Sequence, residues 1–390
     1  MPGLAVYAMG SPFKRLPRLE FVYGAASAEA LDPLAALLDP NVYDNRGLVL
    51  VPDVYSVWPQ VGAFPRSQSY REVLDRLQDY MVRRCGLRLG TVACARASYA
   101  TVPWRGLMGG WRFTGLPGDA HAAVLSALLA AALRERRRPG TVYVVLGEEG
   151  HGALQAVVLE AAAATAALLG ARLEAVAAEP RPFPAETRQV VELHAYSSTG
   201  WSGCLLHTLS LAPEEPLPWR LLEPRTPRGR PPPPSREELL TLQSLVMARR
   251  RWLVALVYSG CGAWDPASKL HGIISRALEA YIDATQLSKR KVGGTVAHHL
   301  GFNHGMVRAL AAAAAAEAAA LRSLGGPAAC EQVYRRGVPR EALKRLEALL
   351  GPDATPSECL EEAQHGPKLR DGCMKRLRAE AAEQAGLPAP

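Results

Sequence analysis

The spacing of hydrophobic residues alternates between two periods over the first 177 positions. Short continuous apolar runs, typical of buried strands, are separated by stretches in which apolar residues recur every three to four positions, as in amphipathic helices. The predicted strands are Leu4–Ala8, Gly47–Pro52, Gly90–Cys94 and Thr141–Leu146. The predicted helices are Ser69–Cys85, Asp119–Arg134 with Asp119 as N-cap, and Ala153–Leu169. This alternation predicts an α/β, Rossmann-like fold, with a mostly parallel sheet between two layers of helices.

The pattern changes after residue 177. Residues 178–235 are rich in proline and end in the stiff run RPPPPS at Arg230–Ser235. Within this connector, Arg188–Tyr196 and Cys204–Ser210 are predicted strands that could form a hairpin through Ser197–Ser202. Residues 236–390 are predicted to be an all-α domain with extra C-terminal helices. Its predicted helices are Arg236–Val257, Pro266–Gln286, Val307–Leu324, Arg340–Leu350 and Glu358–Ala385.

Length and composition narrow the class of protein. A chain of 390 residues exceeds the usual size of one core, and 48% hydrophobic residues exclude a disordered chain. We find no apolar run long enough to predict a membrane span, and Met1–Phe13 lacks the pattern of a signal peptide. The seven scattered cysteines fit a reducing cytoplasm, with a Cys359–Cys373 bridge left open. Cysteines and histidines are not at zinc-ligand spacing, so no metal site is predicted.

The net charge of +8 is compatible with a polyanionic partner such as RNA or a nucleotide, and equally with a generally basic soluble protein.

One candidate ligand site follows the predicted strand at Thr141–Leu146. There the glycine-rich turn Gly147–Gly152 leads into a helix, and Gly10, Ser11 and Pro12 follow the first strand. Doubly wound folds bind ligands at such strand ends, where helix N-termini favour phosphate. The alternative is that the glycines only serve the turn, which every such fold requires. The sequence contains neither a dinucleotide-binding fingerprint nor a P-loop.

A second candidate lies at Leu287–His304, where Arg290 and Lys291 precede a His298–His299 pair. A histidine can move protons near neutral pH, and a guanidinium can stabilise a phosphate. Together they could cleave RNA without a metal, by attack of the 2′-hydroxyl on the adjacent phosphate. The alternative is a solvated basic loop beside an ordinary histidine pair.

Together, these segments give the chain a family resemblance. AVYAMGSPFKRLPRLEFVYG, GLVLVPD, VYVVLGEEGHGALQAVVLEAAAATAALLG and VAHHLGF resemble motifs of the CRISPR-associated CARF–HEPN ribonucleases of the DxTHG type. These are ancillary ribonucleases of type III CRISPR antiviral defence. The resemblance implies an N-terminal CARF sensor domain at 1–177, the connector at 178–235 and a HEPN-like domain at 236–390.

The resemblance also implies the ligand-binding and catalytic residues. For cyclic oligoadenylate they are Gly10, Ser11, Pro12, Glu148, Gly150, His151, Gly152 and Gln155; for RNA cleavage they are Arg290, Lys291 and His298. Glu148 stands where the family has Asp, Gly150 where it has Thr, and Leu154 where it has Asn. Seven residues separate Arg290 from His298, where the family has four to six, so a bulge at Gly293-Gly294 would be needed to restore the spacing.

By resemblance, the expected protein is a cytoplasmic, metal-independent endoribonuclease that leaves 2′,3′-cyclic phosphate ends on single-stranded RNA. Cyclic oligoadenylate would be its allosteric activator, no cofactor would be required, and a homodimer or a multiple of dimers would form both sites. The alternatives are a non-catalytic CARF sensor, or a ring nuclease that cleaves its own activator, with a degenerate HEPN half.

Overall fold

A computed structural model describes most of the chain up to Ser323. The described residues are 2–9, 18–134, 137–147, 152–180, 190–213, 220–233 and 265–323. The predicted helices at Arg236–Val257, Arg340–Leu350 and Glu358–Ala385, and the cysteines Cys359 and Cys373, lie outside them.

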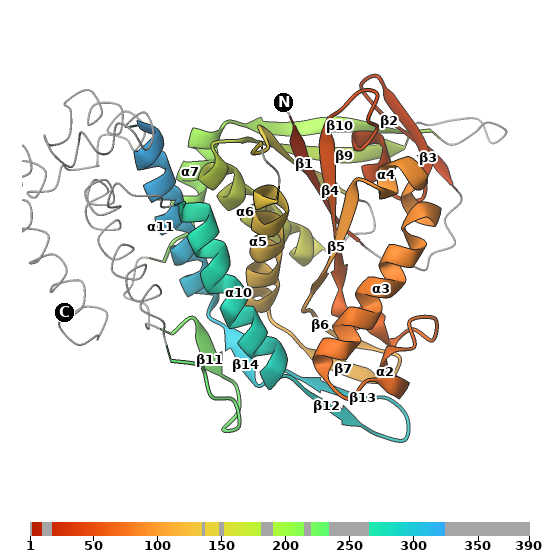
Figure 1. The fold of residues 1–390 in the computed structure, drawn as a ribbon, viewed down its shortest axis with the longest axis vertical. Helices are drawn as coiled ribbons and strands as arrows, with labels where there is room; N and C mark the ends of the chain where they lie inside the picture. The colour runs from red at the N-terminus through yellow and green to blue at the C-terminus, as the bar shows by residue number, and fades with distance from the viewer. Residues whose placement is uncertain are drawn as a thin grey trace, which may run out of the picture.

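The core is an eight-stranded sheet in the order β3-β2-β10-β9-β8-β1-β4-β5 (Figure 1). Its strands are β1 Gly3–Ala8, β2 Leu19–Tyr23, β3 Ala26–Ala30, β4 Asn45–Pro52, β5 Ala97–Val102, β8 Thr141–Leu146, β9 Arg172–Pro180 and β10 Val190–Thr199. The five strands from β9 to β5 are parallel, and β10 runs antiparallel to β9. The α/β prediction is therefore confirmed for the N-terminal half, as a mixed sheet.

Helices cover both faces of this sheet, as the alternation of strands and helices predicts (Figure 1). On one face lie α1 Leu34–Leu37 and α3 Tyr70–Leu89. On the other lie α5 Pro117–Leu133, α6 Gly152–Leu169 and α7 Trp201–Ser210. The predicted strand at Cys204–Ser210 is wrong because Cys204 and Thr208, four residues apart, are buried on one face of α7.

Two further strand predictions need correction. Gly90–Cys94 contains the short helix α4 Thr91–Cys94, which follows the turn at Gly90. A Cys85–Cys94 disulfide ties α4 to α3, which departs from the reducing compartment expected from the scattered cysteines. The hairpin expected through Ser197–Ser202 does not form. Instead β10 pairs with β9 and, on its other side, with β2.

The C-terminal half is not all-α within the described residues. The helices α10 Pro266–Ala284 and α11 His304–Ser323 are confirmed, but three strands lie between them. These are β12 Gln286–Lys289, β13 Gly294–Ala297 and β14 Leu300–Phe302. Val296 and Phe302 are buried in this segment. This segment forms strands and not a helix because strands from earlier in the chain provide backbone hydrogen-bond partners for it.

The strands of the C-terminal half pair with strands from earlier in the chain. β13 pairs with β7 Trp111–Thr114 in a small sheet that also contains β6 Arg105–Met108. β14 pairs with β11 Leu222–Pro224. The sheet that contains β6, β7, β12 and β13 lies near the carboxyl end of β4 (Figure 1). The 3-10 helix η1 Asp53–Val57 and the helix α2 Ala63–Arg66 follow β4 in the chain.

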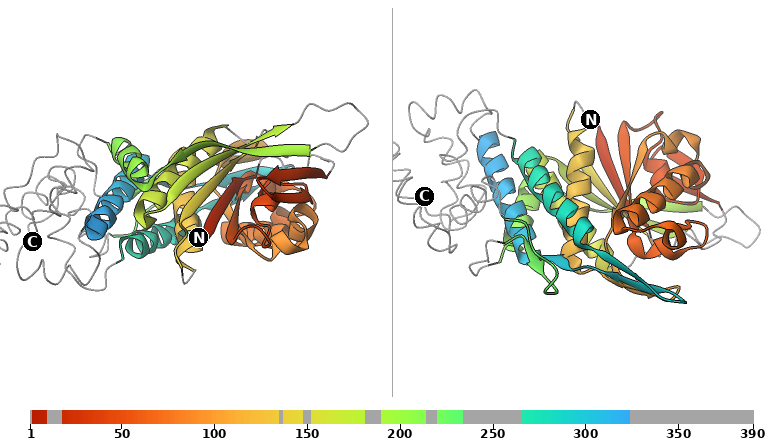
Figure 2. Two further views of the ribbon diagram at one scale, coloured as in Figure 1. Left: turned by 90° about the horizontal axis from the view of Figure 1, so that it is seen from above. Right: turned by 60° about the horizontal axis from the view of Figure 1, so that its bottom comes forward.

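The helices α10 and α11 form a second layer on α5 and α6 (Figure 2). Buried apolar residues of the two halves belong to one contiguous core, which extends from Leu4 to Ala319. By length and composition α6 could cross a membrane, but most of it is buried between the sheet and its neighbouring helices. This burial is that of a core helix.

The start of α5 is fixed by a close backbone approach. Leu116 is the N-cap, and Asp119, predicted as the cap, lies three residues later and accepts a hydrogen bond from the Leu116 backbone N–H at 2.8 Å. At Gly118, a Cβ atom would lie 2.6 Å from the Phe302 carbonyl oxygen and 3.1 Å from the His304 Cβ. Glycine is therefore required where β14 and α11 meet α5.

We predict that Gly118→Ala destabilises the protein although alanine is the better helix former. The new methyl group would overlap a backbone carbonyl, at a cost of roughly 1–3 kcal/mol in the free energy of unfolding. The matched control is Gly86→Ala in α3, where no atom lies within 4 Å of the new Cβ, and this should stabilise by up to about 1 kcal/mol. Urea denaturation measures the change in the free energy of unfolding for each variant. If both changes had the same sign, the close contact at Gly118 would not be the cause.

Candidate functional site

The carboxyl ends of β1 and β8 lie side by side where the strand order changes direction. From β1, the sheet continues through β4 and β5 on one side and through β8 and β9 on the other. Such a switch point is the usual ligand site of an open α/β sheet. Tyr7 and Val145 are paired in register, so the two loops leave the sheet from adjacent strands. The predicted ligand-binding residues that lie outside the described residues are Gly10, Ser11, Pro12, Glu148, Gly150 and His151.

The two remaining predicted ligand residues lie at the start of α6. Gly152 is its first residue and is exposed, and a Cβ built there would meet no atom within 4 Å. Backbone N–H groups in the first turn of a helix lack partners within the helix and favour anions. The Gln155 side-chain amide donates to the Gly147 carbonyl oxygen at 2.8 Å, so it links the end of β8 to the helix.

The predicted catalytic residues are separated by a β-hairpin. Arg290 and Lys291 are exposed in the turn between β12 and β13, and the Arg290 backbone N–H donates to the Gly293 carbonyl oxygen at 3.0 Å. Gly293 has a φ of +77° in this turn, so the two glycines close a hairpin. His298 follows the far end of β13 and is buried. The structure therefore does not bring these three residues together within one chain.

His298 is enclosed by aromatic and polar side chains of the same chain. Its ring stacks on Tyr281, with centroids 5.1 Å apart, and meets the Tyr70 ring edge-on at 5.2 Å. The Nδ1 atom lies 3.0 Å from the Thr114 hydroxyl, and Nε2 lies 3.9 Å from an Asp53 carboxylate oxygen. The side chain is 0% exposed, so it cannot contact an RNA phosphate at the protein surface in this conformation.

Burial shifts the pKa values of His298 and Asp53 in opposite directions. It lowers the pKa of His298 to about 3, and the nearby Arg225 charge acts in the same direction. It raises the pKa of Asp53 to about 7, although hydrogen bonds from the Tyr70 hydroxyl and the Trp104 backbone oppose the rise. A neutral His298 without solvent contact has a structural role in this arrangement, as does His299, which is buried with its Nδ1 2.6 Å from the Thr226 hydroxyl.

A second buried carboxylate, Asp119, lies close to the first. It accepts hydrogen bonds from the Phe302 backbone N–H at 2.8 Å and from the Tyr281 hydroxyl at 3.1 Å, and it forms an ion pair with Arg225. Burial raises the pKa of Asp119, and the Arg225 charge opposes this rise. Arg225 also donates to the Thr114 carbonyl oxygen at 2.6 Å. This network joins α5, the connector, α10 and β14.

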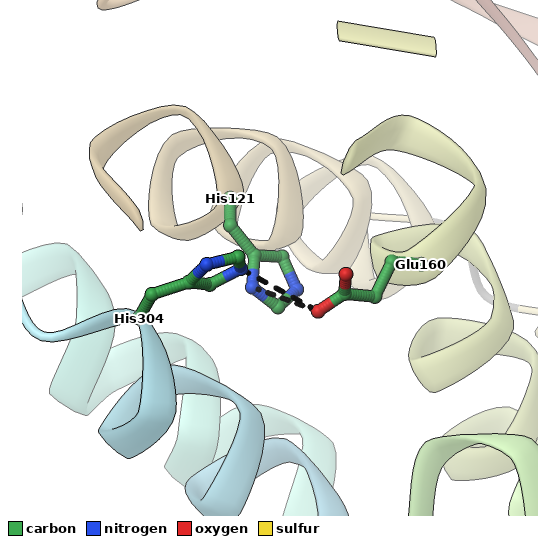
Figure 3. Close-up of side chains that lie close together, drawn as sticks. All are labelled: His121, Glu160 and His304. Atoms are coloured by element: carbon green, nitrogen blue, oxygen red, sulfur yellow. Dashed lines mark ion pairs between the residues drawn. The ribbon is translucent and has the colours of Figure 1, made fainter. Parts of the chain in front are cut away.

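Three further side chains meet between helices (Figure 3). His121 Nδ1 in α5 lies 3.5 Å from Glu160 Oε1 in α6, and His304 Nε2 at the start of α11 lies 3.6 Å from the same oxygen. Arg308 holds the Glu160 carboxylate through two hydrogen bonds of 2.5 and 2.8 Å. Burial lowers the pKa of His121 to about 4. Because each residue comes from a different helix, a search for local metal-ligand spacing in the sequence could not find this group.

No protein-family model matches the chain, and a search of curated proteins finds no match either.

We predict that the stability contributed by His298 depends on pH in one direction. Its folded pKa lies below the unfolded value of about 6.5, so this contribution is present above pH 6.5 and is lost as the pH falls toward 3. Glutamine does not take up a proton, so His298→Gln is not subject to this loss at low pH. The substitution should therefore lower the free energy of unfolding more at pH 7 than at pH 5. The difference should reach about 2 kcal/mol, from about 1.4 kcal/mol per pH unit.

Urea denaturation at the two pH values, with the exposed His207→Gln as control, measures this difference. A cost of His298→Gln that is equal or larger at pH 5 would show that the histidine is not held neutral in the folded protein.

Proposed function

We propose that this protein is a cyclic-oligoadenylate sensor of the CARF type, with its ligand site at the carboxyl ends of β1 and β8. The observation that supports this most is the position of the two segments that resemble family motifs. These segments include β1 and β8, which are adjacent parallel strands at the switch point of the sheet, and the segment with β8 also includes α6. The phosphates of a nucleotide ring would meet the first-turn N–H groups at Gly152.

The proposed assembly is a homodimer. A cyclic ligand with rotational symmetry is best matched by two copies of the same surface around a two-fold axis. The net charge of +8 favours association with an anionic ring. By its family resemblance, the sensor would act in the cytoplasm as part of type III CRISPR antiviral defence.

The described geometry favours the non-catalytic sensor over the ribonuclease that depends on Arg290, Lys291 and His298. General acid–base catalysis requires the histidine to come within hydrogen-bond reach of the reacting group, directly or through one water. His298 is instead enclosed by Tyr70, Tyr281 and Thr114 of its own chain. Arg290 and Lys291 remain as exposed positive charges on a hairpin turn, where they could bind a polyanion without cleaving it.

We predict that the full-length protein binds cyclic tetra- or hexa-adenylate and that Gly152→Glu weakens this binding at least about tenfold. A negative charge at the first position of α6 suits the helix dipole, so the fold should be retained, but it repels phosphate. The matched control Gly152→Ala adds only a methyl group in open space and should bind as the wild type does. Titration calorimetry measures both, and failure of the wild type to bind either ring would overturn the sensor proposal.

We also predict that labelled single-stranded RNA stays uncut when the wild type is saturated with the ring. Cleavage that is abolished in both Arg290→Ala and His298→Gln, with ring binding unchanged, would support the ribonuclease instead. Labelled ring is followed in the same reactions, because its cleavage by the wild type would identify a ring nuclease.

A further inference from the structure

We infer that His121, Glu160 and His304 form a binding site for one divalent transition-metal ion, with Zn²⁺ as the best-fitting ion. The inference is independent of the proposed sensor function. It rests on the positions of three side chains from α5, α6 and α11, whose ligand atoms all lie within 4.8 Å of one another (Figure 3).

The distances in this group fit tetrahedral coordination. Zn²⁺ binds imidazole nitrogen and carboxylate oxygen at about 2.0–2.2 Å, which separates neighbouring ligands by roughly 3.3–3.5 Å. The observed separations from Glu160 Oε1 are 3.5 Å to His121 Nδ1 and 3.6 Å to His304 Nε2. The nitrogen atoms of the two imidazoles lie within 4.8 Å of each other, and His304 is on the exposed side of the group, where its ring can turn to adjust this separation.

The second observation is that the His121 side chain is buried without a hydrogen-bond partner in the described part of the chain. Its side chain is 1% exposed, and neither ring nitrogen has a hydrogen-bond partner among the residues that the structure describes. A buried polar group without a partner is costly, so native proteins rarely retain one without a reason. A metal ion bound to Nδ1 would supply the missing partner. His304 Nε2 also lacks a hydrogen-bond partner in the described structure, and it is directed toward the same carboxylate oxygen.

Arg308 shapes the selectivity of this site. By holding both oxygens of Glu160, it fixes the carboxylate in the way that outer-shell partners fix metal ligands. Its positive charge also offsets the only negative charge among the three ligands. An ion that depends on carboxylate charge, such as Mg²⁺ or Ca²⁺, is therefore disfavoured, whereas ions that bind neutral imidazole are retained.

The site has three protein ligands and therefore an open coordination position. His304 is 29% exposed, so both the ion and a fourth ligand can enter from its side. Structural zinc sites are usually closed by four protein ligands, whereas an open position admits water or a small anionic ligand. The bound ion would also tie α11 to α5 and α6 across the interface between the two helical layers.

The test uses full-length, tag-free protein stripped of metal and titrated with Zn²⁺ alone in a calorimeter. We expect one ion per chain, and a loss of affinity of at least about 100-fold in His304→Ala, because even an outer-shell partner is worth 10–100-fold. His304 is partly exposed, so this variant should fold, and circular dichroism checks that it does. The control His207→Ala removes an exposed histidine and should leave the affinity unchanged.

Co²⁺ provides a second readout, because a tetrahedral site gives it an intense visible absorption. We expect this band in the wild type and in His207→Ala, and its loss in Glu160→Gln and His304→Ala. Absence of Zn²⁺ binding to the wild type, or affinity and spectrum unchanged in folded His304→Ala, would overturn the assignment.

Discussion

The buried carboxylate of Asp119 is the interaction on which the arrangement of the two halves depends. An ionised carboxylate is costly to bury unless its oxygens are fully satisfied, and breaking such a buried pair typically costs about 3–5 kcal/mol. Its donors come from four places: the Leu116 backbone, the Arg225 guanidinium, the Tyr281 hydroxyl and the Phe302 backbone. Because these donors belong to distant parts of the chain, satisfying one charge fixes the connector, α10 and β14 against the start of α5.

The same junction gives the histidines of the C-terminal half different environments. On one side, His298 lies against the Tyr281 ring, and its stacking and burial favour a neutral structural side chain. On the other side, the contact of Gly118 with the β14–α11 turn brings His304 next to His121. Both histidines face a carboxylate, but His298 is fully enclosed whereas His304 is partly exposed, and the neighbouring residues in the sequence do not decide this difference.

The sequence predicts the parts of the fold that depend on local patterns. The predicted strands β1, β4 and β8 and the predicted helices α3 and α6 are confirmed. Each of them packs against the core along its whole length, so the spacing of its own hydrophobic residues indicates its structure. The strand predicted at Cys204–Ser210 fails because its buried positions have helical spacing, whereas the segment between α10 and α11 fails because distant strands decide its structure. The adjacent carboxyl ends of β1 and β8 could be predicted from the order of strands and helices. The group around Glu160 depends on the packing of three helices and leaves no local signal in the sequence.

The parallel pairing of β13 with β7 has a consequence for how the molecule is made. Residues near position 111 cannot complete their sheet until those near 295 have been synthesised, so long-range contacts delay the native state of the N-terminal half. A fragment that ends at the proline run would expose the edge of β7 and leave Asp119 without two of its donors. The two halves are therefore not interchangeable modules, and recombination between related chains would have to preserve both strands of this pair together.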